Sequence, residues 1–268
     1  MKDVSVIIPS YKPGDYVWQC LDSLYGQTLD RSRFEVIVVL NGCNEPWASR
    51  IDGWIAKHPG FEIRLIQTDT PGVSNARNVG LDNAAGEYVA FVDDDDYVSP
   101  RYLEALLERS SRDTVALTDS VYFDDDTDKV IVDNPHHRVF SDRADRGDNT
   151  LLKTRVFFNG PVMKLLHRGV IGDRRFDVRF RNGEDSLMML CVSDRIRHVC
   201  FTSPDAVYYR RIRINSATTG RRSLMSRLKN NLSLMVEYGR CVVSNPSGYD
   251  AAFVASRFLA TIKSIIIK

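Results

Sequence analysis

The chain has 268 residues, of which 43% are hydrophobic and 26% charged. This composition excludes global disorder and suits one large domain with room for a helical appendage. A formal net charge of +1 excludes broad electrostatic capture of nucleic acid.

The five cysteines are scattered and form no CxxC pair. The sequence therefore indicates neither a disulfide framework nor a zinc knuckle, and a reducing cytosol fits best. No apolar segment reaches the length of a signal-peptide core or a membrane-spanning helix. We expect a cytoplasmic protein that at most touches the inner face of the cell membrane.

Short apolar runs alternate with helical patterns along the first 120 residues. The runs typical of buried strands are Val4–Pro9, Phe34–Leu40, Phe61–Gln67, Tyr88–Val92 and Thr114–Leu117. The helical patterns are Asp15–Tyr25, Ser74–Ala84 and Pro100–Arg109. This alternation predicts an α/β fold with a Rossmann-like, mostly parallel sheet and helices on both faces. Ligands of such sheets bind beyond the carboxyl ends of the strands.

The pattern loosens after residue 120. Residues 124–150 contain few apolar side chains and predict an exposed loop or a mobile lid over the site. A helix is expected at Ser186–Val192, and the tail from Ser223 onward is helical in pattern, with Leu224, Leu228, Leu232 and Met235 on one stripe. The sequence thus predicts a C-terminal helical extension.

Four consecutive carboxylates, Asp93–Asp96, follow the apolar run at 88–92. Because like charges repel, a folded protein needs a reason to place them at the end of a buried strand. A divalent cation such as Mg²⁺ or Mn²⁺ provides one, since it binds carboxylates together with substrate phosphates. A solvated acidic turn is the alternative. The run at 124–128 is equally acidic, so acidity alone does not decide.

The segment just upstream favours the first acidic run. Residues 71–80 form a glycine-containing turn into a helix start that carries Arg77. Helix N-termini and guanidinium groups both attract anionic oxygens, as a metal-bound nucleotide diphosphate requires. Tyr11 and Asn41 follow neighbouring strands, where a ring can lie against a base and an amide can bind its edge. Each of these two is also ordinary turn chemistry.

Four segments, in this order, resemble one enzyme family. They are Val4–Tyr11 (VSVIIPSY), Asn41-Gly42, Gly72–Asn78 (GVSNARN) and Phe91–Asp96 (FVDDDD). Together they make residues 1–215 similar to a family 2 glycosyltransferase with the GT-A fold. The resemblance implies an inverting enzyme that uses a nucleotide-diphosphate sugar, commonly in the synthesis of bacterial surface polysaccharides.

The resemblance also implies an organisation of the chain. Residues 1–120 would form the nucleotide-sugar-binding half and residues 121–220 the acceptor-binding half of the same GT-A domain. Residues 221–268 would form the helical C-terminal extension. The acceptor would be a saccharide or a lipid-linked saccharide.

Roles for single residues follow from the same resemblance. The family's DXD element falls on Asp93–Asp95, in which Asp95 ligates the metal, Mn²⁺ or Mg²⁺. Asp93 would contact ribose or a metal-bound water, and Asp94 would also touch the nucleotide sugar. The other expected nucleotide contacts are Pro9, Ser10, Tyr11, Asn41 and Arg77. The resemblance implies a UDP-sugar as the donor. Many members carry two acidic residues where this chain has Leu40 and Asn41, and this departure leaves the exact base contact open.

Inverting transfer also needs a general base for the acceptor hydroxyl. Glu184 and Asp185 resemble the family's ED element, in which the aspartate is the base; Glu184 is the fallback or an acceptor contact. Alternatively, both carboxylates only favour the start of a helix. Lys164, with Arg211 or Arg213, would neutralise the departing diphosphate, unless these cations form a surface patch.

Two other functions compete with this one. A non-catalytic subunit could bind a nucleotide sugar with the same fold, although both Asp95 and Asp185 are present. A nucleotidyltransferase would need a glycine-rich, basic loop after the first strand, where this chain has Pro-Ser-Tyr-Lys-Pro-Gly.

The tail offers two kinds of contact. Residues 250–268 carry an apolar stripe of Val254, Phe258, Ile262 and Ile265 beside the cations Arg257, Lys263 and Lys268. Such a helix can lie on a membrane surface. It can equally pack against residues 224–236 or form a homo-oligomer with a second subunit.

Overall fold

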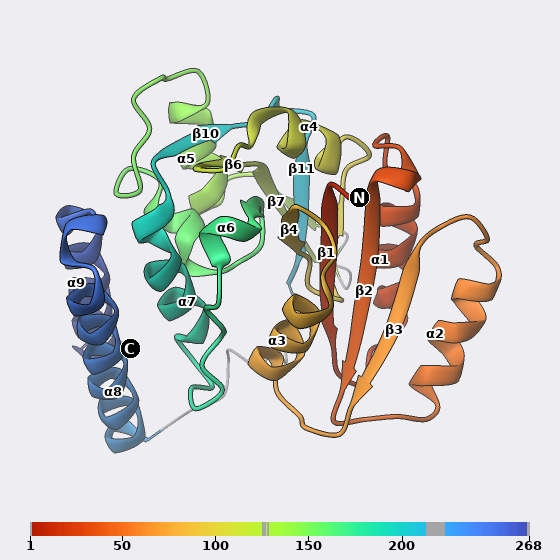
Figure 1. Ribbon diagram of the computed structural model, residues 1–268, viewed down its shortest axis with the longest axis horizontal. Coiled ribbons are helices and arrows are strands. Elements are labelled where there is room, and N and C mark those ends of the chain that lie inside the picture. The colour runs from red at the N-terminus through yellow and green to blue at the C-terminus, as the bar shows by residue number, and fades with distance from the viewer. Residues whose placement is uncertain (1, 125–126, 128, 213–222, 267–268) are drawn as a thin grey trace.

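A computed structural model describes residues 2–124, 127, 129–212 and 223–266 (Figure 1). Its main sheet has seven strands in the order β10-β6-β9-β4-β1-β2-β3. They are β1 (Val4–Ser10), β2 (Phe34–Asn41), β3 (Ile63–Thr68), β4 (Tyr88–Phe91), β6 (Thr114–Leu117), β9 (Lys164–His167) and β10 (His198–Phe201). Neighbours are parallel except around β9, which is antiparallel to both β4 and β6. The predicted mostly parallel sheet is confirmed, with each predicted strand within two residues of its observed bounds.

Helices cover both faces of this sheet. They are α1 (Tyr16–Tyr25), α2 (Trp47–Ala56), α3 (Val73–Asn83), α4 (Tyr102–Arg109) and α6 (Arg168–Ile171). The chain passes through α1 and α2 as it steps from β1 to β3, then returns through α3 to β4 on the other side of β1. Right-handed crossovers in opposite directions place α3 on the opposite face from α1 (Figure 1). A Cβ on Gly80 of α3 would lie 2.3 Å from Ile7 of β1, so glycine permits this close packing.

A second sheet of four strands, in the order β5-β11-β7-β8, was not anticipated from the sequence. Its strands are β5 (Tyr97–Val98), β7 (Asp119–Asp124), β8 (Lys129–Ile131) and β11 (Val207–Arg211). β5 follows the acidic run directly and pairs antiparallel with β11. The second sheet therefore brings residues 207–211 against the acidic run, more than 100 positions away in sequence.

In place of the predicted exposed loop or mobile lid at 124–150, residues 129–131 and 135–143 form a strand and a helix, while residues 144–150 form neither. β8 and α5 (Pro135–Arg143) occupy this segment, and Phe140 is buried. The side chain of Asn134 accepts hydrogen bonds from two backbone N–H groups of the first turn of α5. A cap followed by Pro135 at the first helical position is a helix start that a count of apolar residues overlooks.

The predicted C-terminal helical extension is confirmed. α8 (Leu224–Ser244) and α9 (Ala251–Ile266) form a hairpin beside α7 (Glu184–Val192), in blue in Figure 1. α8 buries Leu234 and Tyr238, whereas Leu224 and Leu232 of the predicted stripe are exposed. The buried face of α8 differs from the predicted stripe because α8 packs against both α7 and α9. α9 buries Arg257, which donates to Asn159 Oδ1 and Arg155 O and so cannot face a membrane. Lys268 lies outside the described residues.

The expectation that no disulfide forms is also wrong. Cys191 of α7 and Cys241 of α8 are bonded, with their Cα atoms 5.6 Å apart. The two residues are 50 positions apart, so only the packing of the two helices decides the pairing. Across the described ranges, every helix is too short or too polar to cross a membrane.

Candidate functional site

The acidic run forms a turn at the carboxyl edge of the main sheet. The backbone N–H of Asp96 donates to Asp93 O at 3.1 Å, which closes the turn. Asp93, Asp94 and Asp95 stay partly exposed, whereas Asp96 is buried. The four carboxylates therefore do not act as one group.

Asp96 is bound on both carboxylate oxygens by the second sheet. Tyr208 donates its hydroxyl to Asp96 Oδ2 at 2.7 Å, and Arg211 donates its backbone N–H to Oδ1 at 2.8 Å. The Tyr208 hydroxyl also accepts the backbone N–H of Asp93 at 3.2 Å. Burial, with the charges of Asp95 and Asp93, raises the pKa of Asp96 well above its ordinary value. Asp96 and Tyr208 hold the turn, and sequence reasoning did not find Tyr208.

Arg77 of α3 joins the two halves of the site. Its buried guanidinium donates to Asp93 Oδ1 at 3.0 Å and to Asp185 Oδ1 at 2.6 Å. The ring of Phe176 lies 5.4 Å from the guanidinium carbon. Burial lowers the pKa of Arg77, but the two carboxylates outweigh it and the net pKa shift is upward. The predicted metal turn and the predicted base are therefore bridged by one permanent cation.

Asp185 lies in the first turn of α7, after Gly183. Gly183 has φ +86°, and its missing side chain leaves room for Leu234 of α8, which would lie 2.4 Å from a Cβ there. Burial raises the pKa of Asp185, and Asp93 adds to the rise, although Arg77 and Lys164 oppose it. The Asp185 carboxylate is partly exposed while Glu184 is buried, so Asp185 is the more accessible of the two.

The predicted nucleoside residues lie at the ends of β1 and β2. Ser10 donates its hydroxyl to Asp94 Oδ2 at 2.6 Å, so β1 also supports the acidic turn. Asn41 donates to Ser10 O at 2.6 Å and accepts the backbone N–H of Gly72 at 2.8 Å. The Asn41 amide thus links the end of β1 to the turn before α3 by hydrogen bonds. Tyr11 is 52% exposed, and Pro9 is buried within β1.

Of the three cations predicted for the diphosphate, the two that the structure describes are both engaged with the protein. Lys164 is buried and donates to the carbonyls of Gly160 and Val162 at 2.7 and 2.6 Å. Burial lowers the pKa of Lys164 to about 7, although Asp185 opposes the shift. Arg211 donates its Nε to Asp95 O at 2.7 Å and also binds Gln19. Arg213 lies outside the described residues.

A metal at this turn would rely on few protein ligands. Within ranges 2–124, 127, 129–212 and 223–266, no group of three or more His, Cys, Asp or Glu side chains could hold an ion. Mg²⁺ and similar ions usually take one or two carboxylates, with substrate phosphates supplying the remaining ligands. The partly exposed Asp93 and Asp95 fit that arrangement. In the second acidic run, Asp124 ends β7, while Asp125, Asp126 and Asp128 lie outside the described residues.

Curated proteins similar to this chain are glycosyltransferases. The poly(ribitol-phosphate) beta-N-acetylglucosaminyltransferase TarS of Staphylococcus aureus is 27% identical over 214 residues, 78% of this chain and 35% of TarS. The uncharacterized glycosyltransferase EpsJ of Bacillus subtilis is 32% identical over 126 residues, 47% of this chain and 36% of EpsJ. The chain therefore spans about a third of the length of these relatives.

Solved structures with the same fold are of GT-A type. TarS 1–349 in complex with UDP-GlcNAc has a TM-score of 0.73 at 22% identity, covering 98% of this chain and 73% of that chain. The mannosyltransferase PcManGT of Pyrobaculum calidifontis, in complex with GDP-Man and Mn²⁺, has a TM-score of 0.62 at 17% identity, covering 98% and 70%. Residues 5–175 match the family described as Glycosyl transferase family 2. With that match over more than half of its length, the chain belongs to glycosyl transferase family 2.

Proposed function

We propose that the chain transfers a sugar, with inversion, from a nucleotide-diphosphate donor to an acceptor hydroxyl. The observation that carries this proposal is the bridge from Arg77 to both Asp93 and Asp185. It joins the turn expected to hold the donor diphosphate to the carboxylate expected to receive the acceptor proton. Membership of glycosyl transferase family 2 supports the same reaction class.

The donor proposed is a UDP-sugar bound at the carboxyl ends of β1 and β2. The exposed ring of Tyr11 would stack against the base, while Ser10 and Asn41 hold the loops around it. The complex of the similarly folded TarS with UDP-GlcNAc supports this choice. The bacterial relative TarS, a poly(ribitol-phosphate) beta-N-acetylglucosaminyltransferase, supports a role in the synthesis of a bacterial polymer, which we propose to be a surface polysaccharide.

The metal proposed is Mn²⁺ or Mg²⁺, held by Asp95 with Asp93 beside it. When bound, such an ion would neutralise the charge that develops on the departing diphosphate. Asp96 would take no part in this, since both of its oxygens are engaged by β11. The Mn²⁺ complex of the similarly folded mannosyltransferase supports a metal in this fold.

Asp185 is the proposed general base. The acceptor hydroxyl oxygen would bond to the anomeric carbon while its proton passes to the Asp185 carboxylate. The bond from that carbon to the diphosphate breaks on the opposite face, and its electron pair leaves with the diphosphate. Arg77 would hold Asp185 in place, and burial would make it a stronger base than an exposed aspartate.

A screen of nucleotide sugars with Mn²⁺ tests the donor and metal assignments. A donor that binds the folded state must raise the Tm, so the correct one should stabilise the protein and be hydrolysed slowly. Asp95→Ala should abolish the Mn²⁺-dependent stabilisation. Asp124→Ala, in the second acidic run, should leave it nearly intact. Equal losses in both variants would remove the reason for preferring the first run.

The same screen separates the enzyme from a non-catalytic subunit. A subunit that only binds donors would show the Tm increase without any turnover. Hydrolysis that depends on Asp185 would exclude that alternative.

A further inference from the structure

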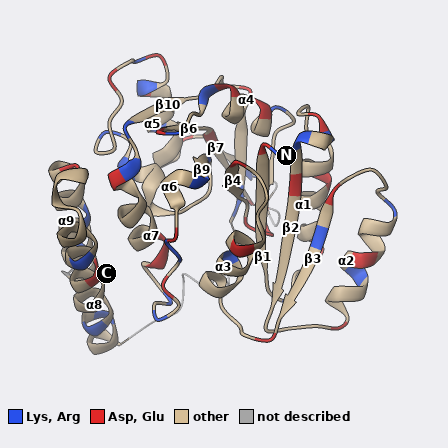
Figure 2. Cartoon of the chain, viewed as in Figure 1, with Lys and Arg blue, Asp and Glu red and all other residues tan. Residues whose placement is uncertain are grey.

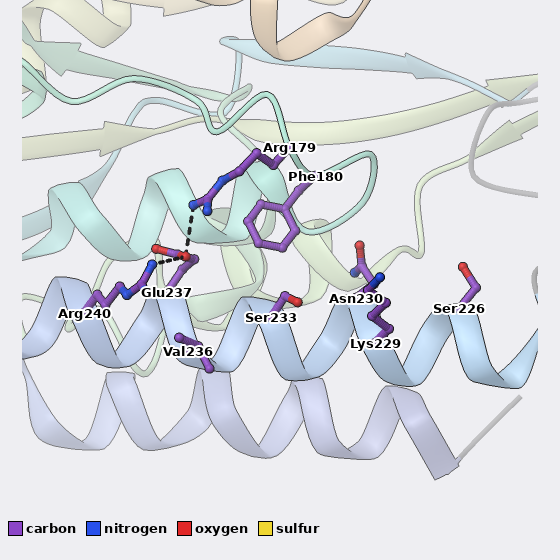
Figure 3. Close-up of a pocket in the computed structure, with 9 residues that line it drawn as sticks. All are labelled: Arg179, Phe180, Ser226, Lys229, Asn230, Ser233, Val236, Glu237 and Arg240. Carbon is purple, nitrogen blue, oxygen red and sulfur yellow. Dashed lines mark hydrogen bonds and ion pairs between the residues drawn. The ribbon is translucent and has the colours of Figure 1, made fainter.

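A groove runs between α8 and the loop before α7 (Figure 3). We call it the α8 groove and define it by Arg179, Phe180, Lys229, Asn230, Ser233, Glu237 and Arg240. Its volume is about 480 Å³, within the range of about 300–1,000 Å³ that ligand sites occupy. None of these side chains has a role in the proposed transfer reaction.

The loop that forms one wall of the groove lies close to Arg77 at both of its ends. At its start, the ring of Phe176 lies 5.4 Å from the Arg77 guanidinium carbon. At its end, Asp185 accepts a hydrogen bond from the same guanidinium. Arg179 and Phe180 lie in the middle of this loop (Figure 3). The groove wall is therefore part of the segment that delivers the proposed base.

The other wall is tied to that loop close to α7. Asn230 of α8 donates its side-chain amide to Asn182 O at 3.2 Å. Leu234, one turn further along α8, packs against Gly183. These contacts bring the groove to the residues that immediately precede Glu184 and Asp185. The groove therefore lies next to the segment that carries Asp185, although Asp185 itself does not line it.

The groove is cationic, and its guanidinium groups are held in place. Glu237 accepts from Arg179 at 3.0 Å and from Arg240 at 2.8 Å, shown as dashed lines in Figure 3. Arg179 is also paired with Asp177. The two arginine side chains nevertheless remain 61% and 67% exposed, and Lys229 is exposed beside them. Among the described residues that line the groove, three are cationic and Glu237 is acidic; with Asp177, which pairs with Arg179, the local balance is three cations to two acids.

The remaining groups suit a saccharide. Ser233 supplies a hydroxyl and Asn230 an amide, both of which can bind sugar hydroxyls. The ring of Phe180 points toward α8 (Figure 3), where it is largely buried and forms an apolar part of the groove lining. Guanidinium groups favour phosphate and carboxylate by charge and by paired hydrogen bonds.

We propose that the α8 groove binds an anionic group, phosphate or carboxylate, carried by the acceptor saccharide. The ligand's identity as the acceptor rests on the proposed function, because only that function places an acceptor at Asp185. The groove would hold the acceptor at a distance from the reacting hydroxyl and so select charged polymers over neutral ones.

Equilibrium binding without donor tests the groove separately from catalysis. The probes are tetragalacturonate, singly phosphorylated maltotetraose, neutral maltotetraose and inorganic phosphate. We expect both anionic tetrasaccharides to bind, with maltotetraose at least tenfold weaker. Tetragalacturonate alone would assign carboxylate, and the phosphorylated probe alone would assign phosphate.

Charge-removing variants supply the matched comparison. Lys229→Gln and Arg240→Gln should each weaken the preferred anionic probe by about two- to fivefold, and the double variant by about tenfold. Lys57→Gln, at an exposed lysine beyond α2, should have no effect. The double variant should bind UDP in the presence of Mn²⁺ as tightly as the wild type. This measurement distinguishes an error in the groove proposal from an error in the proposed donor site. The proposal would be overturned if maltotetraose bound as tightly as the anionic probes, or if Lys57→Gln weakened binding as much as the groove variants do. It would also be overturned if inorganic phosphate bound as tightly as the saccharides and lost affinity in the same variants.

Discussion

At the scale of single residues, burial assigns different roles to chemically identical side chains. Asp93, Asp95 and Asp96 belong to one acidic run, yet only Asp96 is buried and bound on both oxygens. Arg77 is buried as well, but two carboxylates compensate its charge. A buried charge persists only with such partners, so Asp96 supports the turn, whereas Asp93 and Asp95 stay partly exposed.

Replacing Asp185 tests the base assignment. Asp185→Asn keeps the shape but cannot accept a proton, so transfer should fall by about 10²–10⁴-fold while donor affinity survives. Because burial raises the pKa of Asp185, wild-type transfer should decline with falling pH from a midpoint above that of an exposed aspartate. Initial rates from pH 4 to 8 measure both effects. Full activity in Asp185→Asn would make Glu184 the next candidate.

Lys164 should give the stability of the protein a distinct pH dependence. Its pKa is about 7 in the folded chain against the ordinary 10.5, so between these values the unfolded state binds more protons. The unfolding free energy should therefore rise with pH in this window, by up to about 1.4 kcal/mol per unit. Lys164→Met should remove that part of the slope. Urea unfolding at pH 7, 8 and 9 measures it, and parallel slopes in both proteins would contradict the burial argument.

At the scale of elements, α8 is joined to α7 and leaves one face uncovered. The Cys191–Cys241 bond and the packing of Leu234 and Tyr238 anchor one side of the helix. Met225 and Val243, 18 residues apart and so five full turns, are 74% and 76% exposed. Lysine and arginine recur along α8 and α9 (Figure 2).

This exposed face should bind anionic membranes weakly and reversibly, because apolar side chains and cations together favour such surfaces. Met225→Ser with Val243→Ser should reduce flotation with anionic liposomes by about tenfold. Val178→Ser, at a 62% exposed position of the loop before α7, is the control. Unchanged flotation, or a fall in molecular mass by light scattering, would show instead that a second copy covers the face.

At the scale of the whole molecule, the second sheet supports the site built on the first. β11 holds the acidic turn through Tyr208 and Arg211, and Arg77 joins that turn to α7. The donor and acceptor halves of the proposed enzyme are thus connected through side chains at the site itself.

Tyr208→Phe tests this connection. It would leave the buried Asp96 without its hydroxyl donor and the Asp93 N–H without its acceptor. We expect a loss of about 1–3 kcal/mol in unfolding free energy and weaker Mn²⁺-dependent donor binding. The neighbouring Tyr209→Phe keeps the stacking of its ring on Tyr97 and should preserve both properties. Equal stability of the two variants in urea would contradict the supporting role of Tyr208.

Features that depend on local pattern could be predicted from the sequence alone. Apolar runs located the strands of the main sheet that lie in the first 120 residues, and the stripe of Val17, Cys20, Leu21 and Leu24 located α1, because strand and helix periods differ. The order of strands and helices then placed the acidic run and Arg77 at one edge of the sheet. The sequence could not show which aspartate is buried, which carboxylate pairs with Arg77 and which cysteines form the disulfide. Each of those depends on β11, α7 or α8 arriving from 50 to more than 100 residues away, and no local pattern encodes such a contact.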